Sequence, residues 1–399
     1  MSFFENVALA PPDPILGLTA AFLSDTRENK VNLGVGLFKT ENLNTPVLSS
    51  VKAAEAALLD LEKSKEYLPI DGDALFLDMS GALVFGERNW GQEKERIVSF
   101  QTVGGTGALK IGGTFLKEEA ERPIWISTPT WPNHRGVFVS CGLAVESYHY
   151  YDMKTHQIDF NRMLACFEKL PEKTIVLLHA SCHNPTGCDP TFEQWKMLSE
   201  LFKSKKLIPF FDFAYQGFGQ GLDEDAEAVR YFLQNGHEML VAVSNAKNFS
   251  VYGERVGSLF IVSQTPKIAE HIRSRVKQFV RTNYSNPPMH GAKIIAHILS
   301  TPSLRQRWEE EILEMKDRIY QMRLALYDRL AAKGKGDAFS HLPLGRGMFV
   351  FTGLGKPQVE RMISEFGIYM TNDGRINVCG LSPKNLDYVV DAIVKVTKV

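Results

Sequence analysis

Short apolar runs alternate with amphipathic segments along much of the chain. Almost continuous hydrophobicity marks the runs 96–100, 123–127, 174–178, 207–211, 239–243 and 257–262. Such runs are typical of parallel strands that helices cover on both faces. The segments 192–205 and 267–280 have the pattern of crossover helices. Together these patterns predict an α/β domain with a largely parallel sheet.

The pattern changes between residues 303 and 332, which form one long charged segment. Apolar side chains recur there at three- and four-residue steps, at Trp308, Ile312, Met315, Ile319, Met322, Leu326 and Leu330. This spacing predicts a long amphipathic helix that ends near Gly334 and Gly336. The runs 347–352 and 375–378 beyond it predict strands of a smaller α+β unit, and we expect the helix to connect the two units.

The length and the net charge of the chain limit the kinds of protein and of partner that fit this sequence. The chain has 399 residues, 44% of them hydrophobic, and a formal net charge of −1 at pH 7. Because domains commonly hold about 100–200 residues, this length predicts one large domain with a smaller one. The near-zero charge argues against binding of nucleic acid or of an anionic membrane. We therefore expect a small molecule or a second copy of the chain as partner.

The cysteines and the N-terminus indicate the compartment. Five cysteines are few and odd in number, which argues against a disulfide framework and for a reducing compartment. Cys182, His183 and Cys188 stand close together, but no second Cys/His pair follows at zinc-site spacing, so we expect no metal. The first residues lack the basic region of a signal peptide, and no apolar stretch reaches the ~20 residues of a membrane helix. These features predict a soluble cytoplasmic protein.

Ionisable residues follow two of the predicted strands. Asp212 comes directly after the run 207–211, Lys247 comes shortly after the run 239–243, and Arg255 follows the lysine. Neighbouring parallel strands would deliver these side chains to the same end of the sheet. Pyridoxal phosphate requires an amine for a Schiff base, a carboxylate for the pyridinium nitrogen and a cation for the phosphate. The sequence therefore predicts a site for this cofactor.

A glycine-rich segment at 103–109 follows a predicted strand and opens an amphipathic helix. Its backbone N–H groups can converge on an anion beside the helix N-terminus, which predicts a phosphate site. The dinucleotide fingerprint needs a glycine three positions after Gly107, where Lys110 stands, and no Gly-Lys-Ser/Thr follows for a nucleoside triphosphate. Ordinary turn chemistry is the alternative interpretation of this segment taken alone.

Other polar residues near the strand ends fit the same cofactor. The Asn184-Pro185 pair fixes a turn that can aim Asn184 into a cleft, although turn formation alone is the alternative. Asp212 stands among aromatic residues, where an unpaired carboxylate is costly, so it requires a cation such as a protonated pyridine nitrogen. Tyr215 can hydrogen-bond the phenolic oxygen of the same ring; an aromatic core position is the alternative.

Taken in order and spacing, these motifs resemble the class I aminotransferases, specifically the aspartate and aromatic aminotransferases of the fold type I pyridoxal-phosphate enzymes. The resemblance covers nearly the whole chain and is carried by the motifs at 14–18, 32–36, 67–72, 131–134, 212–217, 284–288 and 375–378. It implies a large domain with a mostly parallel, seven-stranded sheet between helices, plus a smaller α+β domain. The implied boundaries are an N-terminal arm at 1–13, a small domain at 14–45 and 310–399, and a large cofactor-binding domain at 46–309.

The resemblance also implies a role for each site residue. The implied cofactor contacts are Gly105, Thr106, Trp131, Asn184, Asp212, Tyr215, Ser244, Lys247, Arg255 and, from the partner subunit, Tyr67. The implied substrate contacts are Gly36, Trp131, Asn184, Arg281 and Arg375. The implied catalytic residues are Lys247, Asp212 and Tyr67.

Lys247 would bind the cofactor covalently and move the proton between substrate and cofactor. Arg375 would clamp the substrate α-carboxylate, a bidentate task that suits a guanidinium. Arg281 would reach from the partner subunit to the side-chain carboxylate of aspartate or glutamate; without the resemblance, a solvated arginine would be the preferred interpretation. Because Tyr67, Arg281 and Asn286 would serve the neighbouring site, the resemblance implies a homodimer with shared active sites.

The implied reaction transfers the amino group of L-aspartate to 2-oxoglutarate. Aromatic amino acids are further candidate donors. The products are oxaloacetate or an aromatic oxo acid, and L-glutamate. An aromatic-amino-acid aminotransferase as main activity stays open, because relatives of that type keep Arg281 too. Ala246 stands where a serine is common and Pro69 where a glycine is usual, and we expect neither departure to abolish activity.

Other classes of function use some of the same features. A different pyridoxal-phosphate reaction, such as β-elimination or decarboxylation, could use the same lysine and acid. A regulator built on an aminotransferase-like domain would need an added basic DNA-binding domain, for which we expect no room before Pro14. A nicotinamide oxidoreductase would need the fingerprint that Lys110 interrupts.

Overall fold

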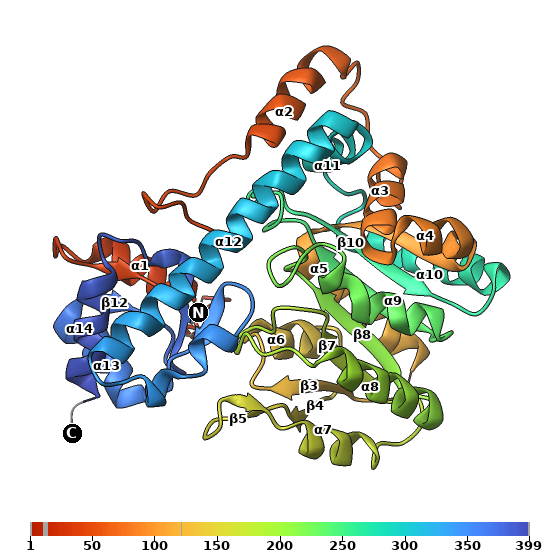
Figure 1. The fold of residues 1–399 in the computed structure, drawn as a ribbon. Coiled ribbons are helices and arrows are strands. Elements are labelled where there is room, and N and C mark those ends of the chain that lie inside the picture. Colours follow the sequence, from red (N-terminus) through yellow and green to blue (C-terminus); the bar gives the residue numbers. More distant parts are fainter. Residues whose placement is uncertain (1, 11–14, 121, 398–399) are drawn as a thin grey trace.

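A seven-stranded sheet forms the centre of the larger part of the molecule (Figure 1). The computed structural model describes residues 2–10, 15–120 and 122–397. The strands of this sheet are β2 (Ile97–Val103), β3 (Ile124–Thr128), β4 (Val145–His149), β7 (Ile175–His179), β8 (Ile208–Phe213), β9 (Met239–Ser244) and β10 (Val256–Val262). Their order is β2-β10-β9-β8-β7-β3-β4, and β10 runs antiparallel to both neighbours while the others are parallel to one another. The predicted α/β fold with a mostly parallel sheet is confirmed.

Helices bury both faces of this sheet. Along β7, Ile175 and Leu177 join one hydrophobic cluster, whereas Val176 and Leu178 join another on the opposite face. The first cluster includes α5 (Gly104–Glu119), α6 (Asn133–Ser140) and α10 (Pro266–Asn283). The second includes α3 (Ala74–Phe85), α4 (Glu87–Glu93), α7 (Phe160–Phe167), α8 (Phe192–Lys205) and α9 (Glu227–Gln234). Burial from both sides is the reason that the central strands are continuously apolar in sequence.

The edge strand β4 is not predicted by the hydrophobic pattern. Its residues Glu146 and Ser147 are exposed, and in this sheet it pairs with β3 on one side. A strand at an edge can carry polar side chains, so its sequence lacks the apolar run that marks the central strands. The short hairpin of β5 (Tyr151–Asp152) and β6 (Gln157–Ile158) follows it and is likewise absent from the prediction.

The long helix α12 (Pro302–Ala332) runs from the sheet part of the molecule to a second group of elements (Figure 1). It matches the helix predicted at 303–332. Its N-terminal part packs near α2 (Ser49–Leu61) and α11 (His290–Ser300). The buried residues of α12 are Trp308, Ile312, Met315, Ile319, Arg323, Leu326 and Leu330. Arg323 is thus a charged residue within an otherwise apolar buried face.

The second group of elements is called the terminal unit here. It comprises α1 (Leu16–Ser24), α13 (Lys356–Phe366), α14 (Leu386–Val396), β1 (Val31–Asn32), β11 (Phe349–Phe351), β12 (Ile368–Tyr369) and β13 (Arg375–Asn377). Strand β1 pairs in parallel with β12, and β11 pairs antiparallel with β13. Segments from both ends of the sequence therefore meet in this unit.

The predicted domain boundaries stay a prediction. Residues 1 and 11–14, which fall in the predicted arm and at the start of the predicted small domain, lie outside the described residues. Short 3-10 helices complete the structure at Lys94–Arg96, Glu224–Ala226, Asp337–Phe339, Leu342–Leu344 and Val378–Gly380.

Candidate active site

The adjacent parallel strands β8 and β9 bring an acid and a lysine together. Asp212 lies opposite Ala242 in the register of the two strands, and Lys247 lies in the turn that follows β9. The Nζ atom of Lys247 is 4.9 Å from the centre of the Tyr215 ring. The carboxyl ends of parallel strands are the usual place for a ligand site in such a sheet. The predicted meeting of Asp212 and Lys247 at one end of the sheet is what the structure shows.

These side chains line a cavity of about 330 Å³ between the sheet and the terminal unit. Its lining includes eleven residues that the sequence predicts: Gly36, Gly105, Thr106, Trp131, Asn184, Asp212, Tyr215, Ser244, Lys247, Arg255 and Arg375. It also includes Ile15, Val35, Leu109, Ala214, Ala246, Tyr252 and Phe349. The fold thus gathers most of the predicted site from distant parts of the chain, while the role of each residue stays a prediction.

A chain of hydrogen bonds supports Asp212 from behind. Nε2 of His134 lies 2.9 Å from Oδ2 of Asp212, and Nδ1 of His134 lies 2.8 Å from Oγ1 of Thr130. Thr130 in turn lies 3.2 Å from Nε2 of His179. An ionised carboxylate only accepts, so His134 donates through Nε2 and, when neutral, accepts from the Thr130 hydroxyl through Nδ1. This order lets His179 donate to Thr130.

The environment keeps Asp212 ionised. Burial acts to raise the pKa of its carboxyl group, but its polar neighbours outweigh burial and lower that pKa below its ordinary value, chiefly through the hydrogen bond from His134 and least through the charge of Lys247. Burial also lowers the pKa of His179 to about 3, so this ring is neutral. Asp212 is therefore a fixed negative charge at the base of the cavity.

Lys247 is close to a protonation equilibrium at neutral pH. Burial lowers the pKa of its amine, the carboxylate of Asp212 opposes this shift and the charge of Arg255 adds to it, which leaves the pKa at about 8. An unshifted lysine has a pKa of about 10.4. The neutral, nucleophilic form is consequently far more populated here than on a protein surface.

The N-terminus of α5 and Arg255 form a cradle for an anion. Gly104 has a φ of +66°, and a Cβ atom there would lie 2.6 Å from a guanidinium nitrogen of Arg255. A Cβ atom at Gly105 would lie 2.9 Å from Cβ of Ser244. Within the described part of the chain, Arg255 donates to the Tyr252 carbonyl at 3.1 Å and has no carboxylate partner. A helix N-terminus beside an unpaired guanidinium fits the phosphate group of pyridoxal phosphate.

Arg375 faces the cavity from the terminal unit. Its guanidinium donates to Oδ1 of Asn184 at 3.0 Å and to the Gly34 carbonyl at 2.7 Å, and it lies 4.3 Å from the centre of the Phe349 ring. Its buried Nε has no hydrogen-bond partner among the described residues. Burial lowers the pKa of Arg375, although the group stays charged. A fixed, buried guanidinium with a spare donor is suited to bind a carboxylate.

Tyr67 and Arg281 lie outside this cavity in the single chain. Tyr67 is 92% exposed, and Arg281 is exposed and donates to Oγ of Ser285. Tyr67, Ser285 and Asn286 line a separate cavity of about 480 Å³. Their predicted roles require a second subunit, so the single chain does not bring them to Lys247.

Among the lining residues that are missing from the predicted site, Tyr252 and Phe349 connect distant segments of the chain. The Tyr252 hydroxyl accepts a hydrogen bond from the Phe38 backbone N–H at 2.8 Å, which ties the lysine-bearing loop to the segment of Gly36. Phe349 packs beneath Arg375. Neither residue is ionisable at neutral pH, and each matters through a contact between distant segments, so the sequence offered no local signal for it.

Among the described residues, we find no group of three or more histidine, cysteine or acidic side chains that could hold a metal ion. No helix within 2–10, 15–120 and 122–397 is long and apolar enough to cross a membrane. All five cysteines are free thiols.

Comparison with known proteins gives the same assignment as the site. The sequence profile of the family "Aminotransferase class I and II" matches residues 28–393. The aspartate aminotransferase of Pseudomonas aeruginosa is 46% identical over 99% of this chain and 100% of its own length.

Two solved structures extend the similarity to three dimensions. The aromatic-amino-acid aminotransferase of Burkholderia pseudomallei, covalently bound to pyridoxal phosphate, superposes with a TM-score of 0.96 and 46% identity over 100% of both chains. The aromatic amino acids aminotransferase of Psychrobacter sp. B6, cocrystallised with aspartic acid, superposes with a TM-score of 0.97 and 41% identity, again over 100% of both chains. The resemblance predicted from the motifs is confirmed: this chain belongs to the class I and II aminotransferases and is homologous to the aspartate and aromatic aminotransferases.

Proposed function

We propose that this enzyme is a pyridoxal-phosphate-dependent aspartate aminotransferase that transfers the amino group of L-aspartate to 2-oxoglutarate, giving oxaloacetate and L-glutamate. One observation carries the proposal: Lys247, Asp212, Arg255 and Arg375 line one cavity although they come from separate segments. Transamination needs an amine, a carboxylate, a phosphate-binding cation and a carboxylate-binding cation. The 46% identity to the aspartate aminotransferase of P. aeruginosa supports the choice of substrate.

The cofactor would lie between the strand ends and the N-terminus of α5. When bound, pyridoxal phosphate withdraws electrons from the substrate Cα and makes its proton removable. The residues that would hold it are Gly105, Thr106, Trp131, Asn184, Asp212, Tyr215, Ser244, Lys247 and Arg255. The hydrogen bond from His134 keeps Asp212 ionised, so Asp212 would hold a proton on the ring nitrogen.

Lys247 would take the proton from the substrate Cα and deliver it to C4′ of the cofactor. A group that both accepts and donates a proton works best when its pKa is near the working pH. The pKa of about 8 for this amine meets that condition. Tyr215 lies beside the lysine, with its ring 4.9 Å from Nζ, and would limit where the amine can move.

Substrate would be held by its carboxylates. Arg375, already fixed by Asn184 and Gly34, would bind the α-carboxylate with Gly36 and Trp131 beside it. Arg281 of the partner subunit would bind the side-chain carboxylate, and Tyr67 of the partner subunit would reach the phosphate. The exposure of both residues in the single chain supports a homodimer that shares its active sites.

Aromatic amino acids are the second candidate class of donor. The lining of the cavity includes the apolar residues Ile15, Val35, Leu109 and Phe349, which could contact an aromatic ring. The similarity to the Psychrobacter sp. B6 protein supports this option, because that protein is named an aromatic amino acids aminotransferase and was cocrystallised with aspartic acid.

The discriminating experiment measures kcat/KM for aspartate, tyrosine and phenylalanine with 2-oxoglutarate as acceptor. We expect aspartate to be preferred by at least about tenfold, equivalent to ~1.4 kcal/mol. A preference for tyrosine or phenylalanine would establish the second candidate. Release of an oxo acid with ammonia but without glutamate would refute transamination and favour elimination, whereas release of carbon dioxide without an oxo acid would favour decarboxylation.

The shared site can be tested with two inactive variants. Lys247→Ala and Arg281→Ala homodimers should each turn over aspartate poorly. If Arg281 serves the partner's site, a hybrid of the two subunits has one site with both residues intact, and mixing should restore activity toward about a quarter to a half of wild type. No recovery in a verified hybrid would refute sharing.

We also propose a cytoplasmic location and domain boundaries at 1–13, 14–45 with 310–399, and 46–309. The free thiols support a reducing compartment. Limited proteolysis and fractionation of the source cells would test the two proposals separately.

A further inference from the structure

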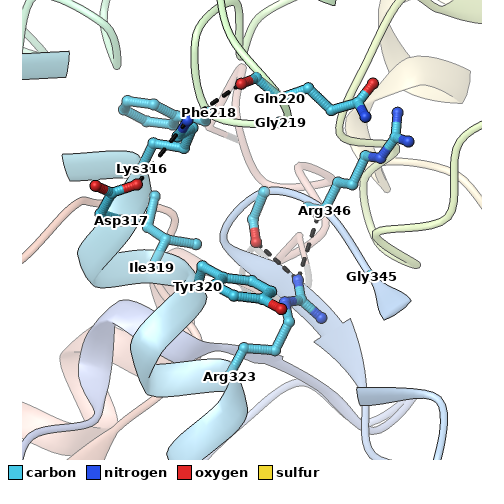
Figure 2. Close-up of a pocket in the computed structure, with 11 residues that line it drawn as sticks. Phe218, Gly219, Gln220, Lys316, Asp317, Ile319, Tyr320, Arg323, Gly345 and Arg346 are labelled. Carbon is cyan, nitrogen blue, oxygen red and sulfur yellow. Dashed lines mark hydrogen bonds and ion pairs between the residues drawn. The ribbon is translucent and has the colours of Figure 1, made fainter. Parts of the chain in front are cut away.

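Arg323 is a buried cation whose hydrogen-bond acceptors are all backbone carbonyls. It is 1% exposed, and burial lowers its pKa to about 10. Nη2 of Arg323 donates to the backbone carbonyls of Gly347 and Phe349 at 2.7 Å and of Arg346 at 3.3 Å. Nη1 donates to the Leu342 carbonyl at 3.3 Å. Figure 2 shows the guanidinium turned from α12 toward the loop that carries Gly345 and Arg346. One side chain thus binds four carbonyls spread along the segment 342–349.

Arg323 does not itself belong to the active-site cavity. Among the described residues it lines another cavity of about 310 Å³, between α12 and the loops at 218–220 and 345–347 (Figure 2). Any effect on substrate must therefore pass through the segment that it binds. A buried charge held by four carbonyls is expensive to maintain, which suggests that the geometry of this segment matters.

The segment that Arg323 holds ends at Phe349, which fixes Arg375. The Phe349 ring centre is 4.3 Å from the Arg375 guanidinium carbon, an arrangement that favours a cation–π contact. The same ring meets Tyr215 edge-on at 5.9 Å. A Cβ atom at Gly36 would lie 2.9 Å from the ring, so the ring fills the space beside that backbone. The Phe349 ring is therefore packed between the Arg375 guanidinium, the Tyr215 ring and the Gly36 backbone.

The loop that carries Asn184 rests on the same carbonyls. Gly187 has a φ of +69°, and a Cβ atom there would lie 2.6 Å from the carbonyl oxygen of Phe349 and 3.2 Å from Nη2 of Arg323. The Gly187 carbonyl accepts a hydrogen bond from the Arg346 N–H at 2.7 Å. Asn184, three residues earlier, accepts from Arg375 at 3.0 Å. Both side chains that steady Arg375 thus depend on backbone that Arg323 organises.

We infer that Arg323 is a positioning residue for substrate binding: by holding the 342–349 segment against the 184–187 loop, it places Phe349 and Asn184 so that Arg375 is ready for the α-carboxylate. The inference rests on the proposed function, because it takes Arg375 as the carboxylate site. Every amino acid and oxo acid substrate carries that carboxylate, so the effect must be common to all of them. The phosphate end of the cavity, at Gly105 and Arg255, is built from other segments and should be untouched.

The first test replaces Arg323 by methionine, which keeps much of the length but loses charge and donors. We expect KM for aspartate and for 2-oxoglutarate to rise by about tenfold each, equivalent to ~1.4 kcal/mol. The affinity for pyridoxal phosphate and the absorption spectrum of the bound cofactor should stay as in wild type. Arg323→Lys keeps a charge and some donors, so its KM should lie between those of wild type and Arg323→Met.

Arg329→Met is the matched control on the same helix. Arg329 is partly exposed and donates to Asp387 at 2.7 Å, away from the 342–349 segment. Its loss should leave both KM values unchanged. An unchanged KM in Arg323→Met, or a loss of cofactor affinity equal to the loss of substrate affinity, overturns the inference.

Phe349→Leu tests the same connection without altering Arg323, and it remains informative if Arg323→Met does not fold. It removes the ring beneath Arg375 while leaving the backbone carbonyl that Arg323 binds. We expect a similar rise in KM for both substrates, and the double variant with Arg323→Met should cost clearly less than the sum of the two, since coupled residues are not additive. Full additivity, or an unchanged KM in Phe349→Leu, overturns the inference. If instead the wild-type enzyme forms no glutamate from aspartate, the proposed function fails first.

Discussion

Replacing Arg375 by alanine should weaken every amino acid substrate, whereas Arg281→Ala should weaken only substrates with a second carboxylate. Arg375 is 2% exposed and is held by Asn184, the Gly34 carbonyl and the Phe349 ring before any substrate binds. A group fixed in advance loses little entropy on binding, so most of its interaction with a carboxylate contributes to affinity. Arg281 is exposed in the single chain and would meet only the side chain of the substrate.

The size of the effect follows from burial. Removing one member of a buried, hydrogen-bonded charge pair costs roughly 2–5 kcal/mol. Because ~1.4 kcal/mol is tenfold, kcat/KM in Arg375→Ala should fall roughly 30-fold to several-thousand-fold for aspartate and phenylalanine alike. In Arg281→Ala the same range applies to aspartate, while phenylalanine should change by less than about threefold, which is under ~1 kcal/mol.

The assay measures kcat/KM for both donors with 2-oxoglutarate held constant. Arg275→Ala is the control, because Arg275 lies on the same helix as Arg281 but pairs with Glu119 at 3.6 Å on the surface. It should leave both donors unaffected, since exposed ion pairs contribute little. An equal loss for both donors in Arg281→Ala, or a loss confined to aspartate in Arg375→Ala, would refute the assignment of the two arginines.

The other predictions concern the cofactor side of the cavity. Lys247→Ala should keep the fold and much of the cofactor binding but abolish turnover, and transamination at the wild-type rate by the purified variant would show that the lysine is misassigned. Asp212→Ala should bind cofactor yet lose most of kcat; a normal kcat at full cofactor occupancy would count against it. Gly105→Ala places a Cβ atom 2.9 Å from Cβ of Ser244 and should weaken cofactor binding in equilibrium dialysis, so an unchanged dissociation constant would contradict the phosphate cradle. Burial lowers the pKa of Lys247 to about 8, so cofactor uptake by the cofactor-free protein should accelerate as pH rises toward 8 and level off above it, where the neutral amine prevails. A rate that keeps rising about tenfold per pH unit above pH 8, as an unshifted lysine with a pKa of about 10.4 would give, would refute the shift.

The part of the site that could be predicted from local pattern is the part built on the sheet. Asp212 and Lys247 follow apolar runs, and because helices bury both faces of β8 and β9, those runs locate the strand ends directly. Adjacent parallel strands then bring the two side chains together. The glycines at 104 and 105 also had a local signal, since a helix N-terminus after a strand is a short-range feature.

The terminal unit was predictable only in outline. The sequence indicated strands near 347–352 and 375–378, but the role of Arg375 came from resemblance to a family, because no local pattern shows which cavity its strand faces. Phe349, Tyr252 and Arg323 matter through contacts with segments far away in sequence. Such contacts depend on how the terminal unit packs against the sheet, which hydrophobic periodicity does not determine. The edge strand β4 was not predicted because its exposed residues leave it without an apolar run.

The charges that line the cavity favour anionic ligands. Of the described residues in the lining, Lys247, Arg255 and Arg375 are cationic and Asp212 is the carboxylate. Positive charge in excess is costly away from bulk water, and burial accordingly lowers the pKa of both Lys247 and Arg375. A phosphate at Arg255 and a carboxylate at Arg375 would each supply compensating negative charge. Because the two arginines belong to different units of the fold, we predict that Arg255 binds the phosphate and Arg375 the substrate carboxylate independently of each other.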